Sequence, residues 1–127
     1  MASDFKELQA ALAHLQIEVN EAVQEATASV AKEGVKKLKK RSRELFGKGN
    51  YANGWTFKVL PGGGKAVIFN KKYQLTHLLE HGHDIVRKGV KVGEAKAKPH
   101  IKEVEEFCIE ETEKEITKAI NKALEGK

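Results

Sequence analysis

The chain has 127 residues, the length of a single domain with room for a modest hydrophobic core. Its net charge of +5 is basic but far below that of a protein that packs DNA. Charged residues make up 32% of the chain, and lysine and glutamate dominate them, a composition typical of a soluble, helix-rich protein.

Cysteine usage and hydropathy add further exclusions. Cys108 is the only cysteine, which rules out an internal disulfide and a cysteine-based zinc site and suits a reducing cytosol. The segment MASDFKELQAAL at the N-terminus has no basic region followed by an apolar run, so we expect no signal peptide. No apolar run approaches the ~20 residues that a membrane helix needs.

Residues 4–46 have the periodicity of a long helix. Asp4 and Glu7 resemble a capping box. Apolar residues then recur at helical spacings of three and four, at Phe5, Leu8, Leu12, Leu15, Val19, Val23 and Ala26. Around and beyond Gly34 the apolar positions form a second stripe, rotated by roughly 100° from the first. Its members are Ala31, Val35, Leu38 and Leu45. Because a straight helix cannot turn both stripes toward one core, we expect a kink or break near Glu33–Gly34.

A β-hairpin and a short helix are predicted next. After the Gly- and Asn-rich loop FGKGNYANGW, the segment WTFKVL alternates apolar and polar residues, as in a half-buried strand. PGGGK lacks the spacing of a phosphate-binding loop and is better interpreted as a turn into a second strand, AVIFN. The hairpin therefore covers residues 55–70. A helix over 73–81 follows and ends at Gly82.

The last third of the chain divides into a loop and a helix. Residues 83–98, HDIVRKGVKVGEAKAK, are basic and glycine-spaced, and we expect a mobile loop that orders against a neighbouring subunit, with Val90–Val92 as a candidate edge strand. Pro99 stands where a helix begins, and residues 100–125 form an amphipathic helix. The predicted fold is a single α+β domain over residues 1–127. A long kinked N-terminal helix and a C-terminal helix pack on a small antiparallel sheet built around the hairpin.

His77-Leu78-Leu79-Glu80-His81 matches the H-x-x-E-H pattern of inverted zinc peptidases. Two features argue against catalysis: the helix ends directly after His81, and His77, Glu80 and His81 are predicted to project away from its apolar side. A structural or partner-contact role is the preferred interpretation, with incidental metal binding by His77, His81 and His83 as the alternative. Cys108 lies on an apolar helix face, which favours packing over nucleophilic catalysis. We therefore expect no catalytic residue, no functional metal and no cofactor.

A basic run, KKLKKRSR, continues the first helix. Four of its cations and one that precedes it fall on a single helical stripe, and they are candidate phosphate contacts: Lys32, Lys36, Lys39, Lys40 and Arg43. A solvated helix face is the simpler interpretation. Because no recognition helix or aromatic platform accompanies the stripe, any contact with DNA would be independent of base sequence.

Three motifs in order carry a resemblance to a known family: GNYANGWTFKV, YQLTHLLEHGH and AKPHIKEVEE. With them the chain resembles the small structural proteins of lambdoid siphophages typified by gene product ten of the HK group, which act in head–tail joining or tail completion and are also described as minor capsid proteins. The motifs span about half of the chain. The chain departs from the family at Lys48, where a threonine is frequent, and in the loop before the third motif, which is often richer in glycine and arginine.

The resemblance implies a non-enzymatic virion protein. It would assemble as a homo-oligomer in the host cytoplasm and contact the phage connector, the tail terminator or tail-tube proteins, with DNA passing nearby. The residues that the resemblance marks as family-motif or partner-contact positions are Gly49, Asn50, Tyr51, Gly54, Trp55, Tyr73, His77, Glu80, His81, Gly82, His83, Pro99 and His100. The alternative is a small cytosolic nucleic-acid-associated protein that uses the basic stripe.

Overall fold

A computed structural model describes residues 2–62 and 64–125. The chain forms an α+β fold with two two-stranded antiparallel sheets. In chain order its elements are α1 (Ala2–Phe46), α2 (Asn50–Asn53), β1 (Trp55–Val59), β2 (Ala66–Asn70), α3 (Tyr73–His81), β3 (His83–Arg87), β4 (Val90–Ala95) and α4 (Lys102–Glu125). Within these described residues, no helix is long and apolar enough to cross a membrane.

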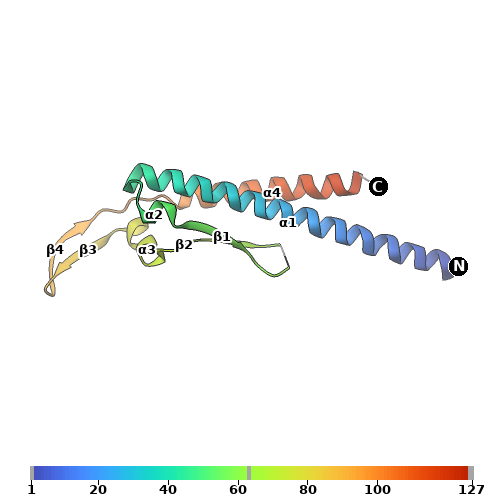
Figure 1. Ribbon diagram of the computed structural model, residues 1–127, viewed down its shortest axis with the longest axis horizontal. Helices are drawn as coiled ribbons and strands as arrows, with labels where there is room; N and C mark the ends of the chain where they lie inside the picture. The colour runs from blue at the N-terminus through green and yellow to red at the C-terminus, as the bar shows by residue number, and fades with distance from the viewer. Residues whose placement is uncertain (1, 63, 126–127) are drawn as a thin grey trace.

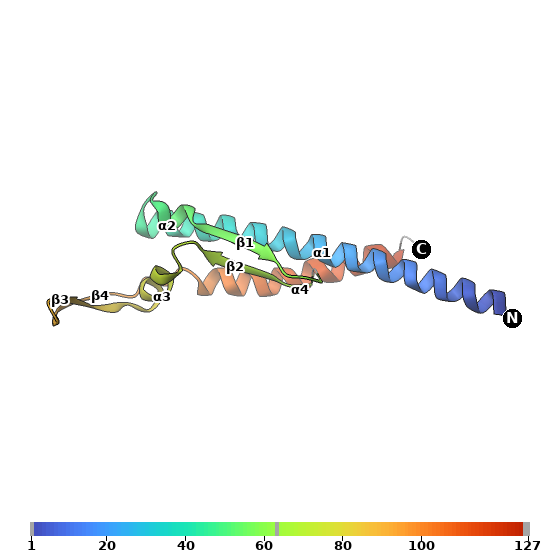
Figure 2. The ribbon, with the colours of Figure 1, turned by 60° about the horizontal axis from the view of Figure 1, so that its bottom comes forward.

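Two antiparallel helices form the backbone of the molecule. α4 packs along the C-terminal part of α1, and the β1–β2 hairpin lies against this helix pair (Figures 1 and 2). The last turns of α4 lie beside Glu18–Ser29 of α1. The first turns of α1 therefore extend beyond the end of α4, and the N-terminus is one tip of an elongated molecule (Figure 2).

The helix α1 is not broken at Glu33–Gly34, where the shifted apolar stripe predicted a kink or break. Helical backbone continues from Ala2 to Phe46. The shift instead reflects a change of packing partner: the end of the early stripe packs beside α4, whereas Val35 and Leu38 also pack against the hairpin residue Trp55. A Cβ atom on Gly34 would lie 2.7 Å from Cys108 Sγ and 2.8 Å from the Ile68 side chain, so glycine permits close packing here.

The core lies where α1, the first hairpin and α4 meet. β1 and β2 pair with Trp55 opposite Asn70 and Val59 opposite Ala66, and burial decreases along β1 from Trp55 toward the turn. The buried cluster comprises Val35, Leu38, Tyr51, Trp55 and Val104, flanked by Phe46, Phe57, Ile68, Leu79, Ile101 and Cys108. Aromatic and aliphatic side chains from four separate chain segments thus share one small core.

Residues 83–98, expected to be a loop, contain a second hairpin. β3 and β4 pair from His83 opposite Ala95 to Arg87 opposite Val90, with a bulge after Ile85. The connection is the two-residue turn Lys88–Gly89, and both residues have positive φ, as a type I′ hairpin turn requires. The strands form a separate sheet rather than joining β1 and β2. The hairpin projects from the end of the molecule opposite the N-terminus (Figures 1 and 2).

The close packing at Gly34 leads to a prediction. Gly34→Val would place a branched side chain against Cys108 and Ile68, and we expect overpacking to lower the free energy of unfolding by about 1–3 kcal/mol. The matched control is Glu33→Val, an equally branched substitution at the neighbouring exposed position, which should stay within about 0.5 kcal/mol of the parent. Urea denaturation measures both. Equal stability of the two variants would contradict the packing account.

Candidate functional site

A buried polar cluster brings the three motifs together, and we call it the His100 cluster: His100, Tyr51, Glu80 and Thr76. The His100 side chain is 1% exposed. Its Nε2 lies 2.7 Å from the Tyr51 hydroxyl, and its Nδ1 lies 2.9 Å from the Lys98 carbonyl oxygen and 3.0 Å from Glu80 Oε1. Because both neighbours of Nδ1 are acceptors, Nδ1 carries a proton. The Tyr51 hydroxyl also lies 3.4 Å from Thr76 Oγ1.

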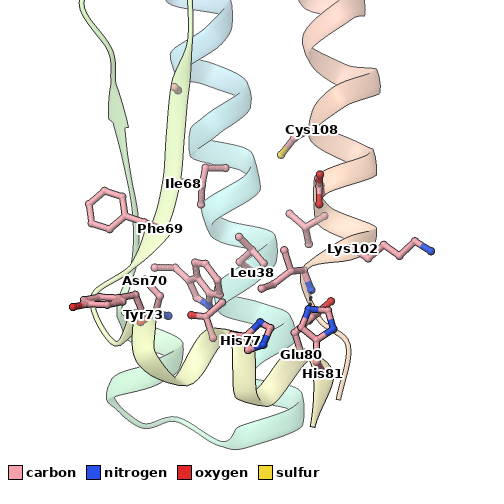
Figure 3. A pocket seen from close by; sticks show the side chains of 16 residues that line it. Leu38, Ile68, Phe69, Asn70, Tyr73, His77, Glu80, His81, Lys102 and Cys108 are labelled. Carbon is pink, nitrogen blue, oxygen red and sulfur yellow. Dashed lines mark hydrogen bonds between the residues drawn. The ribbon is translucent and has the colours of Figure 1, made fainter. Parts of the chain in front are cut away.

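Glu80 caps the start of α4, although the helical spacing predicted that it would point outward. Its Oε1 accepts hydrogen bonds from the backbone N–H groups of His100 at 2.7 Å and Ile101 at 3.1 Å. Figure 3 shows Glu80 reaching from α3 toward this helix start. The segment Lys98–Ile101 contains no Ser, Thr, Asp or Asn to cap the helix, so the acceptor comes from another element. That missing local cap is the sequence signal that could have indicated an inward-facing carboxylate.

The surroundings of the cluster shift two pKa values in opposite directions. Burial alone would raise the pKa of the Glu80 carboxyl, but the hydrogen bonds from His100 and Ile101 and the nearby imidazole outweigh burial and lower the pKa below 4.5. Burial raises the pKa of the Tyr51 hydroxyl, partly offset by the Thr76 hydrogen bond and reinforced by the Glu80 charge. Glu80 is therefore held as a carboxylate and Tyr51 as a neutral phenol. Groups held in these states stabilise the cluster and are poorly suited to transfer a proton.

Further buried hydrogen bonds extend this network into the first motif. Trp55 Nε1 donates to Ser42 Oγ at 2.8 Å, tying β1 to α1. Asn70 is 2% exposed and its Nδ2 donates to the Tyr51 carbonyl oxygen at 2.8 Å. The ring of His100 also makes edge contacts with Phe46, Tyr51 and Trp55, at centroid distances of 5.0 to 6.1 Å. Motif residues thus bind one another across the fold.

The two histidines of the H-x-x-E-H pattern lie outside the cluster. The rings of His77 and His81 are exposed and their centroids are 4.8 Å apart, while Glu80 is turned toward α4. Across residues 2–62 and 64–125, no group of three His, Cys, Asp or Glu side chains is arranged to hold a metal ion. A carboxylate that already accepts two backbone hydrogen bonds is also poorly placed to activate water.

A groove of about 920 Å³ opens between β2, α3 and the start of α4 (Figure 3). Its walls include the apolar residues Leu38, Ile68 and Val104, and His77 and His81 lie along it. The polar side chains Asn70 and Glu80 also border the groove, but their oxygen atoms are engaged by backbone N–H groups of the chain itself. Tyr73, Lys102, Glu105 and Cys108 line it as well, so the groove combines apolar walls with polar and titratable side chains.

The structure divides the thirteen motif residues into an interior and an exterior group. Tyr51, Gly54, Trp55 and His100 are buried, and Glu80 and Gly82 are half-buried. Gly82 has φ of 78° and approaches the Ala95 carbonyl oxygen, so its role is to bring the second hairpin back onto α3. These six positions are architectural, and a partner contact through the buried ones is not feasible in the folded chain. The exposed motif residues are Gly49, Asn50, Tyr73, His77, His81, His83 and Pro99.

The basic stripe lies on the side of α1 that faces away from the core. Lys32, Lys36, Lys40 and Arg43 are exposed and Lys39 is half-buried. At about 100° per residue these positions are centred roughly 110° around the helix from Val35, Leu38 and Ser42, which face the hairpin and α4. The stripe is therefore accessible to a phosphate backbone. Cys108, by contrast, packs against the core, and burial raises the pKa of its thiol despite the nearby Lys37.

No protein-family model, curated protein or solved structure matches this chain.

The capping role of Glu80 leads to a prediction. Glu80→Gln keeps the size of the side chain but removes the charge that strengthens its hydrogen bonds to His100 and Ile101, and we expect a loss of about 1–2 kcal/mol in the free energy of unfolding. Glu110→Gln, at an exposed position of α4, is the matched control and should change it by less than about 0.5 kcal/mol. Chemical denaturation at neutral pH measures both variants.

The same pair of proteins gives a pH test. Because folding lowers the pKa of Glu80 below 4.5, its contribution to stability is complete above that value and is lost as pH falls through the folded-state pKa. The stability difference between the parent and Glu80→Gln should therefore be constant near neutral pH and shrink below about pH 4.5. A difference that is absent at neutral pH, or that grows in acid, would contradict the capping account.

Proposed function

We propose that the chain is a structural protein of a phage virion that joins the head to the tail or completes the tail through ring-like oligomeric assembly. The observation that carries the proposal is the apolar surface at both ends of the elongated molecule. Phe5, Leu8 and Leu12 near the N-terminus, and Val86 and Val90 on the second hairpin, are each more than half exposed. Apolar groups left uncovered at projecting elements are typical of interaction sites.

The buried motif residues give this proposal a second support. Tyr51, Trp55 and His100 hold the chain together from the inside, so these positions would be required by any member of a family that shares the architecture. On this account the motifs specify a rigid body, and the projecting elements carry the contacts. The partners would be further copies of the chain and the phage connector, tail terminator or tail-tube proteins, with assembly in the host cytoplasm and final residence in the virion.

The proposal also assigns the chain no enzymatic activity and no cofactor. The carboxylate of the H-x-x-E-H pattern is engaged by α4, and the groove beside it is lined mostly by apolar side chains. The polar groups of the His100 cluster bind one another, and such a cluster suits a protein that must hold its shape under load. That property is what a joint between two assemblies requires.

A second candidate function rests on the basic stripe. Lys32, Lys36, Lys39, Lys40 and Arg43 lie on one accessible face, which could neutralise several phosphates of a passing duplex. Such binding would be independent of base sequence and would weaken steeply with salt. It is compatible with a virion protein near the DNA channel, and it would stand alone as the function of a small nucleic-acid-associated protein.

Removing the gene from the encoding phage tests the proposal. We expect the deletion lysate to contain DNA-filled heads and separate tails by electron microscopy, with infectious titre reduced by several orders of magnitude and restored by the chain supplied from a plasmid. Mass spectrometry of purified parental particles should detect the chain. Normal infectious particles without it would contradict the virion role, and tight sequence-specific DNA binding at physiological salt would favour the second candidate.

A further inference from the structure

Two projecting elements at opposite ends of the molecule lack cover from the rest of the chain. We define the N-terminal arm as residues 4–21 and the hairpin arm as residues 83–95. The first part of the N-terminal arm extends past the end of α4, and neither β3 nor β4 makes more than marginal contact with another described element (Figures 1 and 2). Isolated two-stranded hairpins gain most of their stability from packing, and exposed apolar side chains on a helix mark an interaction surface. Both arms therefore need a partner surface.

The N-terminal arm presents a narrow apolar stripe. Its members recur at alternating spacings of three and four residues, at Phe5, Leu8, Leu12, Leu15 and Val19. This is the pattern with which a helix packs along another element. Phe5, Leu8 and Leu12 are exposed, whereas the same stripe farther along α1 is covered by α4 at Ala22 and Ala26. The stripe is thus the uncovered continuation of a helix seam that is filled elsewhere in the chain.

The hairpin arm presents apolar residues of its own. Side chains alternate between the two faces of the strands, and the register places Ile85, Arg87 and Val90 on one face. The other face carries Val86 together with Asp84 and Lys91, which pair at 3.3 Å. One face therefore combines two aliphatic side chains with a cation. The stripe from Phe5 to Val19 spans about 21 Å along α1, close to the roughly 17–20 Å of a strand of five or six residues.

The charges of the arms are complementary. Residues 4–21 contain four carboxylates and one lysine, whereas residues 83–95 contain three lysines or arginines and two carboxylates. Two N-terminal arms would repel each other, as would two hairpin arms, but one of each would attract. Because the arms lie at opposite ends of the molecule, they can meet only between different copies (Figure 1).

We infer that the chain associates head to tail: the apolar stripe of the N-terminal arm of one copy packs on the Ile85–Val90 face of the hairpin arm of the next. Such a contact is heterologous, and repeating it yields a ring if the rotation between copies closes. The inference rests on the proposed function in so far as that function requires ring-like assembly, and it names the two surfaces that form the joint. Each contact is small, so association is favoured by ring closure or by neighbouring virion proteins.

Disulfide trapping between separately purified variants tests the contact. Leu12→Cys places a thiol on the stripe and Val90→Cys places one on the hairpin face, and both positions are exposed, so folding should be unaffected. After mixing under mild oxidation at low salt, intact mass spectrometry should show mixed dimers in at least several-fold excess over either homodimer. Ala10→Cys, exposed on the opposite side of α1 at about 100° per residue, is the matched control and should trap several-fold less with Val90→Cys.

Charge reversal provides an independent test of the contact. Arg87→Glu in the Val90→Cys chain should reduce the mixed dimer several-fold, and Glu7→Lys in the Leu12→Cys chain should restore it. Homodimers equal to or exceeding mixed dimers, or equal trapping by Ala10→Cys, would overturn the head-to-tail contact. These measurements use only the purified chain, so they can fail while the deletion phage still shows separated heads and tails, and the virion role can fail while the contact stands.

Discussion

The hydrogen bonds between the Glu80 carboxylate and the start of α4 are the interaction on which the rest of the structure depends. The carboxylate accepts hydrogen bonds from the backbone N–H groups of His100 and Ile101 and lies beside the His100 imidazole. The imidazole in turn forms a hydrogen bond with the Tyr51 hydroxyl. Three segments far apart in the sequence are thereby fixed to one point: the turn after α1, the short helix α3 and the beginning of α4. Polar groups buried in this way are costly unless each has a partner, so the cluster specifies one arrangement of the segments.

The His100 cluster also determines how the two projecting elements, the second hairpin and the first turns of α1, are placed. The second hairpin leaves α3 at Gly82 and returns at Lys98, whose N–H donates to the Leu79 carbonyl oxygen at 2.8 Å. α4 runs from His100 along α1 and leaves the first turns of α1 uncovered (Figure 1). The motif residues therefore act on function indirectly, because they orient the surfaces that we propose to contact other proteins. The H-x-x-E-H spacing arises because the capping carboxylate Glu80 and the exposed His77 and His81 lie on the same short helix, α3.

Much of this fold was predictable from local patterns, and the failures have physical causes. The apolar spacing over residues 4–46, the alternation in WTFKVL and the glycine after His81 correctly gave α1, β1 and the end of α3. The second hairpin was predicted only in part: Val90–Val92, expected as a candidate edge strand, lies in β4. β3 and its pairing with β4 were missed because both faces of the hairpin are largely exposed, and the Lys88–Gly89 turn was the signal that could have indicated them. Gly34 suggested a break in α1 because glycine is a poor residue for a helix interior. The sequence does not show that Cys108 and Ile68 pack closely against this position. The inward direction of Glu80 depends on a helix start twenty residues later.

The claim that Glu80 anchors α4 is most directly tested by amide hydrogen exchange at His100 and Ile101, measured by NMR. Amides at a helix start normally exchange rapidly because they have no acceptor within the helix. If Glu80 holds them as described, both should exchange as slowly as amides in the buried middle of α1, and both should lose that protection in Glu80→Gln. Rapid exchange at both positions in the parent chain would contradict the account.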